Sequence, residues 1–150
     1  MTSSRRVLCD SNVLVHLTNS ISDEHTTAGK AILALEEQGV AFLYTLQNLA
    51  EFWNVCTRDR PSGLGLTTEE AAERVQLIGT QFTYMPETAA AEPIFKDILI
   101  RQRVRGVQVH DARLVALMMA NGVEEILTFD RKDFRRYGAV TVLHPSDFAQ

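Results

Sequence analysis

Short apolar runs alternate along the chain with longer segments in which apolar residues recur at helical spacing. The short runs predict strands at 7–9, 40–44, 82–85, 125–130 and 140–143. The longer segments predict helices that begin near positions 11, 22, 46, 67, 87, 109 and 131. Strands that alternate with helices are typical of an α/β fold with a mainly parallel central sheet. We expect that architecture as a single domain over 1–150.

Local signals mark where several helices begin and end. Gly122 follows an apolar helical segment, at the position where a C-cap glycine is expected. Ser11 or Asn12 can cap the first helix, because short polar side chains accept from free N–H groups there. Pro93 lies inside the helical segment 87–105 and is expected to kink or interrupt it.

The composition is that of a globular protein with a core of its own. A chain of 150 residues can bury about two-thirds of the surface that its unfolded form exposes. Cys9 and Cys56 both lie in apolar runs, which favours buried thiols over a disulfide. The start, MTSSRR, precedes only a very short apolar run, so neither a signal peptide nor a membrane span is expected. We therefore expect a cytoplasmic protein.

Two aspartates end predicted strands that lie far apart in the sequence. Asp10 follows the buried run 7–9, and Asp130 ends the run 125–130. If the two strands are neighbours in one parallel sheet, both carboxylates lie at its carboxyl edge, where ligands collect in open α/β sheets. The alternative for Asp10 is a helix cap. Asp133, three residues after Asp130, can serve as a further ligand or as a cap.

Two more carboxylates lie on predicted helices. Asp111 falls in a first helical turn, where the helix dipole alone favours a negative charge. Glu51 lies inside the helix 46–58, on a narrow polar stripe within a broad apolar arc. A solvated stripe is one interpretation of Glu51, and a wet cleft beside a largely buried helix is the other.

Four carboxylates at one edge of a sheet have a definite chemistry. They are hard oxygen ligands, and without nearby Cys or paired His they favour Mg²⁺ or Mn²⁺ over zinc. One or two such ions can hold a phosphodiester and acidify the attacking water, so no Ser or Cys nucleophile is required. Without a cation the carboxylates repel one another, which raises some of their pKa values.

Four segments in this order resemble the motifs of the PIN domain family, in particular its VapC-like toxin branch. They are Leu8–Val15 (LCDSNVLV), Asn48–Trp53 (NLAEFW), Val109–Arg113 (VHDAR) and Ile126–Phe134 (ILTFDRKDF). The resemblance implies a three-layer α/β/α sandwich with about five strands and a Mg²⁺- or Mn²⁺-dependent endoribonuclease. It also implies a homodimer that is inhibited by a cognate antitoxin protein. The matching acids, hereafter the acidic quartet, are Asp10, Glu51, Asp111 and Asp130. Asn12 and Thr128 match supporting polar positions, and Asp133 matches an additional acid.

An RNA substrate has to be reconciled with a net charge of −4, because phosphate contacts dominate nucleic-acid affinity. Three local basic clusters are candidates for RNA contacts. One lies beside the fourth motif and consists of Arg131, Lys132, Arg135 and Arg136. The second consists of Arg101, Arg103 and Arg105, and the third of Arg58 and Arg60. For each cluster the alternative is solubility or complementing a helix dipole, and an antitoxin can pair with the same arginines. A loop of a structured RNA such as a tRNA is the expected kind of substrate.

His110 can assist proton transfer, but a metal-activated water needs no such base, so structural roles are expected for it and for the other histidines. Three other functions could use acids placed in this way. A haloacid-dehalogenase-type phosphatase places a second Asp where this chain has Asn12, and a receiver domain needs a mid-chain Asp and a late strand-end Lys that do not appear. The third rival is a PIN-like module that binds RNA or protein without cutting.

Overall fold

The structure, a computed structural model, describes residues 5–148 and contains one five-stranded, all-parallel sheet in the order β3-β2-β1-β4-β5. Most of the segment MTSSRR lies outside the described residues. The strands are β1 (Arg5–Cys9), β2 (Val40–Tyr44), β3 (Thr83–Tyr84), β4 (Glu125–Leu127) and β5 (Thr141–Leu143). The predicted parallel α/β sheet is therefore confirmed, and β1 and β4, which precede Asp10 and Asp130, are direct neighbours.

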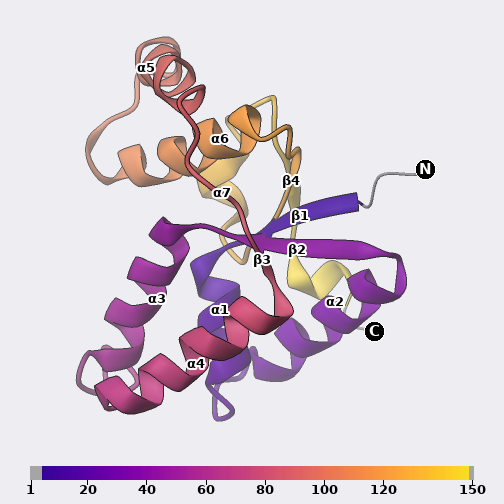
Figure 1. Cartoon of the computed structure of the whole chain (residues 1–150), viewed down its shortest axis with the longest axis vertical. Coiled ribbons are helices and arrows are strands. Elements are labelled where there is room, and N and C mark those ends of the chain that lie inside the picture. Colours follow the sequence, from indigo (N-terminus) through magenta and orange to yellow (C-terminus); the bar gives the residue numbers. More distant parts are fainter. Residues whose placement is uncertain (1–4, 149–150) are drawn as a thin grey trace.

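Helices cover both faces of the sheet and complete the expected three-layer sandwich (Figure 1). On one face lie α1 (Ser11–Thr18), α2 (His25–Glu37), α3 (Leu46–Thr57) and α4 (Thr68–Gln81). On the other lie α5 (Ala91–Arg101) and α6 (Val109–Ala120), followed by the single turn α7 (Arg131–Phe134). Among the described residues, the 3₁₀ helix η1 (Gly106–Gln108) directly precedes α6, and a second, η2 (Pro145–Asp147), follows β5. Among residues 5–148, no helix is long and apolar enough to cross a membrane.

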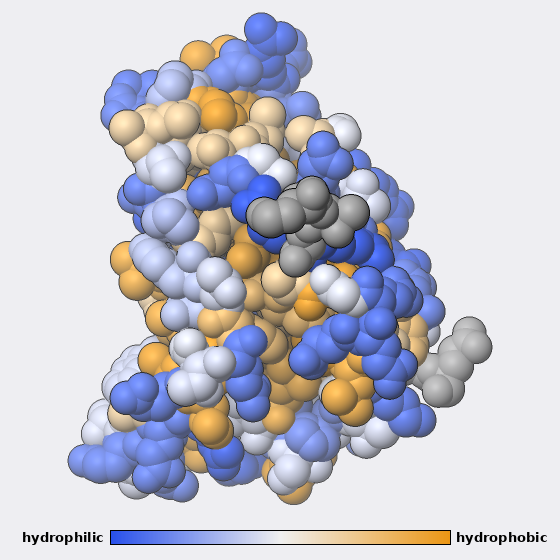
Figure 2. Space-filling view, turned by 45° about the vertical axis from the view of Figure 1, so that its right-hand side comes forward, coloured by the Kyte–Doolittle hydropathy of each residue, from blue (hydrophilic) through white to orange (hydrophobic). Residues whose placement is uncertain are grey.

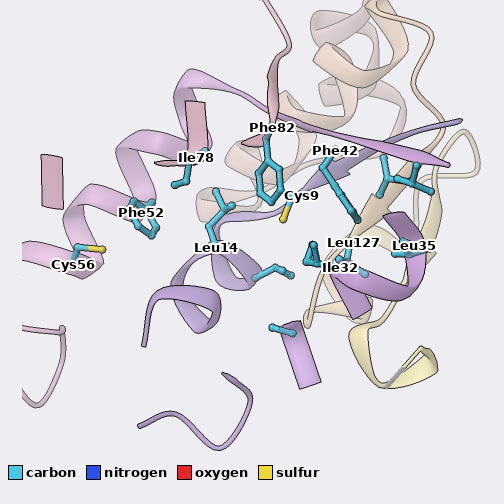
Figure 3. Close-up of a cluster of buried hydrophobic side chains, with 14 of the residues drawn as sticks. Cys9, Leu14, Ile32, Leu35, Phe42, Phe52, Cys56, Ile78, Phe82 and Leu127 are labelled. Atoms are coloured by element: carbon cyan, nitrogen blue, oxygen red, sulfur yellow. The ribbon is translucent and has the colours of Figure 1, made fainter. Parts of the chain in front are cut away.

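The pleat of the strands divides the core into two halves. Val7 and Cys9 of β1 pack with α1 to α4, whereas Leu8 between them packs with α5 and α6. Figure 3 shows the first half, in which Phe42 and Phe82 stack with ring centroids 5.5 Å apart. Because successive strand residues point to opposite faces, the buried residues Val7, Leu8 and Cys9 make both faces of this part of β1 apolar, and β1 lies at the centre of the sheet.

Three local predictions were wrong in detail. The first helix is capped by Asp10, whose side chain accepts from the Ser11 N–H, and not by Ser11 or Asn12. Helix α5 begins at Ala91, so Pro93 stands in its first turn, where the missing N–H costs no helical bond and causes no kink. The fourth strand ends at Leu127, three residues before the acid that was expected to end it.

The predicted orientation of α3 also needs correction. Its broad apolar arc was expected to be buried, yet Leu46 is 62% and Trp53 37% exposed, while the polar Gln47 is buried. Hydrophobic side chains also reach the surface on other elements (Figure 2). The large exposed ones among the described residues are Ile21, Leu33, Leu46, Trp53, Leu77, Tyr84, Ile100, Val107 and Met119.

Candidate functional site

The parallel pairing of β1 with β4 brings Asp10 and Asp130 to the same edge of the sheet. Cys9 is in register with Leu127, and the Asp10 N–H donates to the Leu127 carbonyl at 3.0 Å. Asp10 is 7% exposed, whereas Asp130 is open to solvent. The first strand-end carboxylate is thus held in the protein interior and the second lies at the mouth of the site.

Thr128 and Asn12 connect these two carboxylates. Thr128 Oγ1 donates to Asp10 Oδ2 at 2.8 Å and accepts the Asp130 N–H at 3.0 Å. Asn12 Nδ2 donates to Asp130 Oδ2 and to Thr128 Oγ1, both at 3.1 Å. Asn12 Oδ1 in turn accepts the Phe129 N–H at 3.2 Å. The two predicted supporting residues therefore fix the loop after β4 and the orientation of both acids.

Glu51 and Asp111 approach the strand acids from helices on opposite faces of the sheet (Figure 1). Asp111 lies in the first turn of α6 and is half-buried. Burial, followed by the charges of Asp133, Asp10, Glu51 and Asp130, raises the pKa of Asp111 to about 7. The structure thus brings all four carboxylates of the acidic quartet, and Asp133, into one electrostatic cluster.

The other buried acids show the same crowding. Burial raises the pKa of Asp10 to about 6 against the bonds from Thr128 and Ser11, with smaller contributions from the charges of Glu51 and Asp130. Burial also raises the pKa of Glu51, against the neighbouring Gln47 and His110. Raised pKa values mean that each of these carboxylates ionises at a cost unless a positive charge comes close.

The donor set suits a hard divalent cation. Its members are carboxylate oxygens, and Glu51 Oε1 is buried without a hydrogen-bond partner within the described residues. An unpaired buried carboxylate oxygen is costly unless a cation satisfies it. In the same part of the chain, however, no three acidic, His or Cys side chains form a ready ligand group. Holding a cation would therefore require the carboxylates of the acidic quartet to lie closer together than they do in this structure.

A polar cleft of about 490 Å³ adjoins Asp130. Its lining residues are Phe129, Asp130, Arg131, Lys132, Asp133, Arg135, His144 and Ser146. Arg131 is held by Asp147 at 2.6 Å, whereas the side chains of Lys132 and Arg135 make no hydrogen bond or ion pair among the described residues. His144 packs edge-on against Phe129, with ring centroids 5.4 Å apart. This cleft contains most of the basic cluster of the fourth motif.

The other predicted contacts are more dispersed. Arg101 pairs with Asp97 one turn away on α5, as expected of a solvated helix surface. Arg58 donates to the Ser62 carbonyl, and Arg60 is exposed nearby. Arg136 donates to Gln108 Oε1, away from the cleft lining.

Two residues at the start of α3 were missed as parts of the site. Asn48 is buried, accepts from the Thr45 backbone and hydroxyl, and leaves Nδ2 without a partner in the described region. Gln47 is buried and donates to the His110 carbonyl at 2.8 Å. The sequence contains no local signal for this contact, because the partner of Gln47 lies 63 positions away.

The chain is similar to known proteins in sequence. The model of the PIN domain family matches residues 7–140. Ribonuclease VapC48 of Mycobacterium tuberculosis is 32% identical over 143 residues, which cover 91% of this chain and 94% of that protein.

Two solved structures share the fold. One is the Sarcin-Ricin loop cleaving toxin VapC20 of M. tuberculosis, with a TM-score of 0.64, 19% identity, and coverage of 87% of this chain and 95% of that one. The other is VapBC2 of Rickettsia felis bound to a DNA fragment from its promoter, with a TM-score of 0.68, 13% identity, and coverage of 93% and 98%.

Proposed function

Because the chain belongs to the PIN domain family, we propose that it is a Mg²⁺- or Mn²⁺-dependent endoribonuclease that acts as the toxin of a toxin–antitoxin pair. The observation that carries the proposal is the acidic quartet. Four carboxylates from two strand ends and two helices share one cluster, and burial with mutual repulsion raises the pKa of Asp10 and of Asp111. Such crowding is consistent with a site that is stabilised when a cation enters.

The acidic quartet and Asp133 would hold the cation, which supplies charge neutralisation and an acidified water for phosphodiester hydrolysis. Thr128 and Asn12 keep the carboxylates of Asp10 and Asp130 oriented toward each other. Burial of Asp10 excludes bulk water from the inner part of the site and strengthens the electrostatic interactions made there. His110, exposed beside Glu51, has no required part in proton transfer.

RNA would reach the acidic quartet along the cleft beside Asp130. Lys132 and Arg135 line that cleft, and they can contact phosphates on one side of the scissile bond, with Arg58 and Arg60 as candidates near α3. Local cations of this kind let a protein with a net charge of −4 bind a polyanion. A single-stranded loop of a structured RNA, such as a tRNA, is the proposed substrate.

Two protein partners belong to the proposal. One is a cognate antitoxin, consistent with solved relatives that are VapBC complexes. The other is a second copy of the chain, because Leu46 and Trp53 lie seven residues apart on α3 and are both exposed. A spacing of seven places them on one side of the helix, where they can form an apolar contact between copies.

The proposal is tested by incubating the purified protein with total cellular RNA in Mn²⁺ and in EDTA, beside Asp10→Asn, and sequencing the new RNA ends. Cuts that need Mn²⁺ and disappear in the variant are expected, and their positions identify the substrate. RNA that stays intact with antitoxin-free protein, but is bound equally by both proteins, would support the non-cleaving module instead.

A further inference from the structure

The side-chain amide of Gln47 joins the helix that carries Glu51 to the helix that carries Asp111. Gln47 Nε2 donates to the His110 carbonyl at 2.8 Å, and Gln47 Oε1 accepts from Arg113 Nη1 at 3.3 Å. Within residues 5–148, no other hydrogen bond connects α3 with α6. Gln47 is only 7% exposed, so both polar ends of a buried amide are used between these two helices.

We propose that Gln47 is a positioning residue that sets the separation of Glu51 and Asp111 in the acidic quartet, an inference that rests on the proposed function. Gln47 lies four residues before Glu51, on the same side of α3. His110, whose carbonyl it binds, directly precedes Asp111. One hydrogen bond therefore fixes the offset between the two helices at the points where their carboxylates project.

The two halves of the acidic quartet differ in how they are held. Asp10 and Asp130 follow paired strands, whose register already determines their relative position. Glu51 and Asp111 have no such register, because α3 and α6 cover opposite faces of the sheet (Figure 1). The relative position of Glu51 and Asp111 therefore depends on a directional contact between α3 and α6, and the hydrogen bonds of Gln47 provide that contact.

Arg113 and Glu87 determine which way the Gln47 amide points. Arg113 Nη2 and Nε donate to Glu87 Oε1 at 2.7 and 3.2 Å, which holds the guanidinium in place beside Gln47. The guanidinium has donors only, so the amide must turn its oxygen toward Arg113 and its nitrogen toward the His110 carbonyl.

The test compares wild type with Gln47→Met, which keeps the length of the side chain and removes both hydrogen bonds. We expect kcat for Mn²⁺-dependent RNA cleavage to fall about 10–100-fold, as for other residues that orient ligands, with KM for RNA nearly unchanged. The Mn²⁺ concentration for half-maximal rate should rise several-fold. The affinity for Mn²⁺, measured by the electron paramagnetic resonance of the free ion, should fall in parallel.

The matched control is Gln38→Met. Gln38 also accepts from an arginine, Arg5 Nη1 at 2.9 Å, but at the start of β1, at the other end of the strand from Asp10. This variant should cleave and bind Mn²⁺ as wild type does. Arg113→Met keeps Gln47 and its bond to the His110 carbonyl but removes the guanidinium that orients the amide, together with the exposed ion pair to Glu87, so a smaller loss of the same kind is expected. If Gln47→Met fails to fold, Arg113→Met decides the question by the same measurements.

The outcomes separate this inference from the function on which it rests. A wild type that neither cleaves RNA nor binds Mn²⁺ overturns both, because it removes the proposed function. An active wild type with unchanged kcat and Mn²⁺ response in Gln47→Met overturns the positioning role alone. The positioning role is also overturned if Gln47→Met loses activity only in proportion to its unfolded fraction. In that case the variant is as active as wild type at temperatures well below its melting temperature.

Discussion

Thr128 Oγ1 donates a 2.8 Å hydrogen bond to Oδ2 of Asp10, a buried contact between residues 118 positions apart. The hydroxyl is a favourable partner for a carboxylate that has little access to water. It also accepts the Asp130 N–H. This single side chain therefore connects the inner and the outer strand-end acids of the site.

Thr128→Val keeps the shape of that side chain and removes its hydroxyl. The free energy of unfolding should fall by about 1–3 kcal/mol, since a buried acceptor loses its donor. RNA cleavage should fall about 10–100-fold because Asp10 is no longer oriented. Chemical denaturation and cleavage rates measure the two effects. Thr128→Ser should retain most activity, and Thr141→Val, at an exposed position of β5, should change neither quantity. Wild-type cleavage by Thr128→Val would contradict the role assigned to the hydroxyl.

Metal-free protein should become less stable as the pH rises from about 4 to 7. The pKa of Asp10 is raised from 3.8 to about 6 and that of Asp111 to about 7, so the folded state holds more protons than the unfolded state in that window. Folding is then favoured at the acidic end and loses this contribution as the carboxylates ionise. The melting temperature in EDTA should drop by roughly 6–12 °C for a loss of about 3 kcal/mol, which is the contribution of the buried Asp10 alone, since the half-exposed Asp111 is discounted for solvent screening.

Asp111→Asn isolates this effect. The variant should melt above wild type in EDTA at pH 8 and should lose the rise in melting temperature that Mn²⁺ gives wild type. The rise in the melting temperature of wild type with Mn²⁺ should be larger at pH 8 than at pH 5, because the carboxylates that bind the ion are ionised at pH 8. Equal melting curves for the two proteins in EDTA, together with no response of wild type to Mn²⁺, would sink this explanation.

The cleft beside Asp130 predicts a defined salt dependence. Replacing Lys132 and Arg135 together with Ala should raise KM for RNA about tenfold and reduce the slope of log affinity against log salt by about 2. Replacing Lys96 and Arg101 removes the same charge from α5, where each is paired with an acid one turn away. That control should leave the slope almost unchanged. Equal effects of the two double variants would show that the net charge alone matters.

The exposed apolar residues of α3 predict an association of two chains. Leu46→Arg combined with Trp53→Arg should convert a dimer to a monomer in light scattering coupled to gel filtration, since charges replace the proposed contact. The control is Leu33→Arg on α2. Leu33 is about as exposed as Leu46, and this variant should leave the dimer intact. A wild-type monomer at all accessible concentrations would refute the contact.

The strand-end acids could be predicted from the sequence because their signal is local. A buried run followed by an Asp places a carboxylate at the edge of a parallel sheet, and two such runs place two together. Glu51 and Asp111 gave weaker local signals, and their membership of the acidic quartet came from the resemblance to a family. Their placement beside Asp10 depends on tertiary packing that no helical pattern contains.

Gln47 and the outer face of α3 show why the remainder was not predicted. A helical wheel separates polar from apolar residues, but it does not tell a core from a surface that another molecule can cover. The broad apolar arc of α3 was therefore expected to be buried, although Leu46 and Trp53 within it are exposed. The sequence leaves the polar stripe that includes Gln47 open between solvent and a wet cleft, because the partners of Gln47, the His110 carbonyl and Arg113, come from a helix far away in the sequence.

The central claim is that the acidic quartet is a single cation site, and a titration of Mn²⁺ followed by electron paramagnetic resonance tests it most directly. Wild type should remove at least one free Mn²⁺ per chain from solution, and Asp10→Asn and Asp111→Asn should each weaken that binding at least tenfold. Asp10 follows a strand and Asp111 lies on a helix. If both variants lose Mn²⁺ affinity, the two carboxylates belong to the same site. Binding that is absent in wild type, or equal in all three proteins, would contradict the claim.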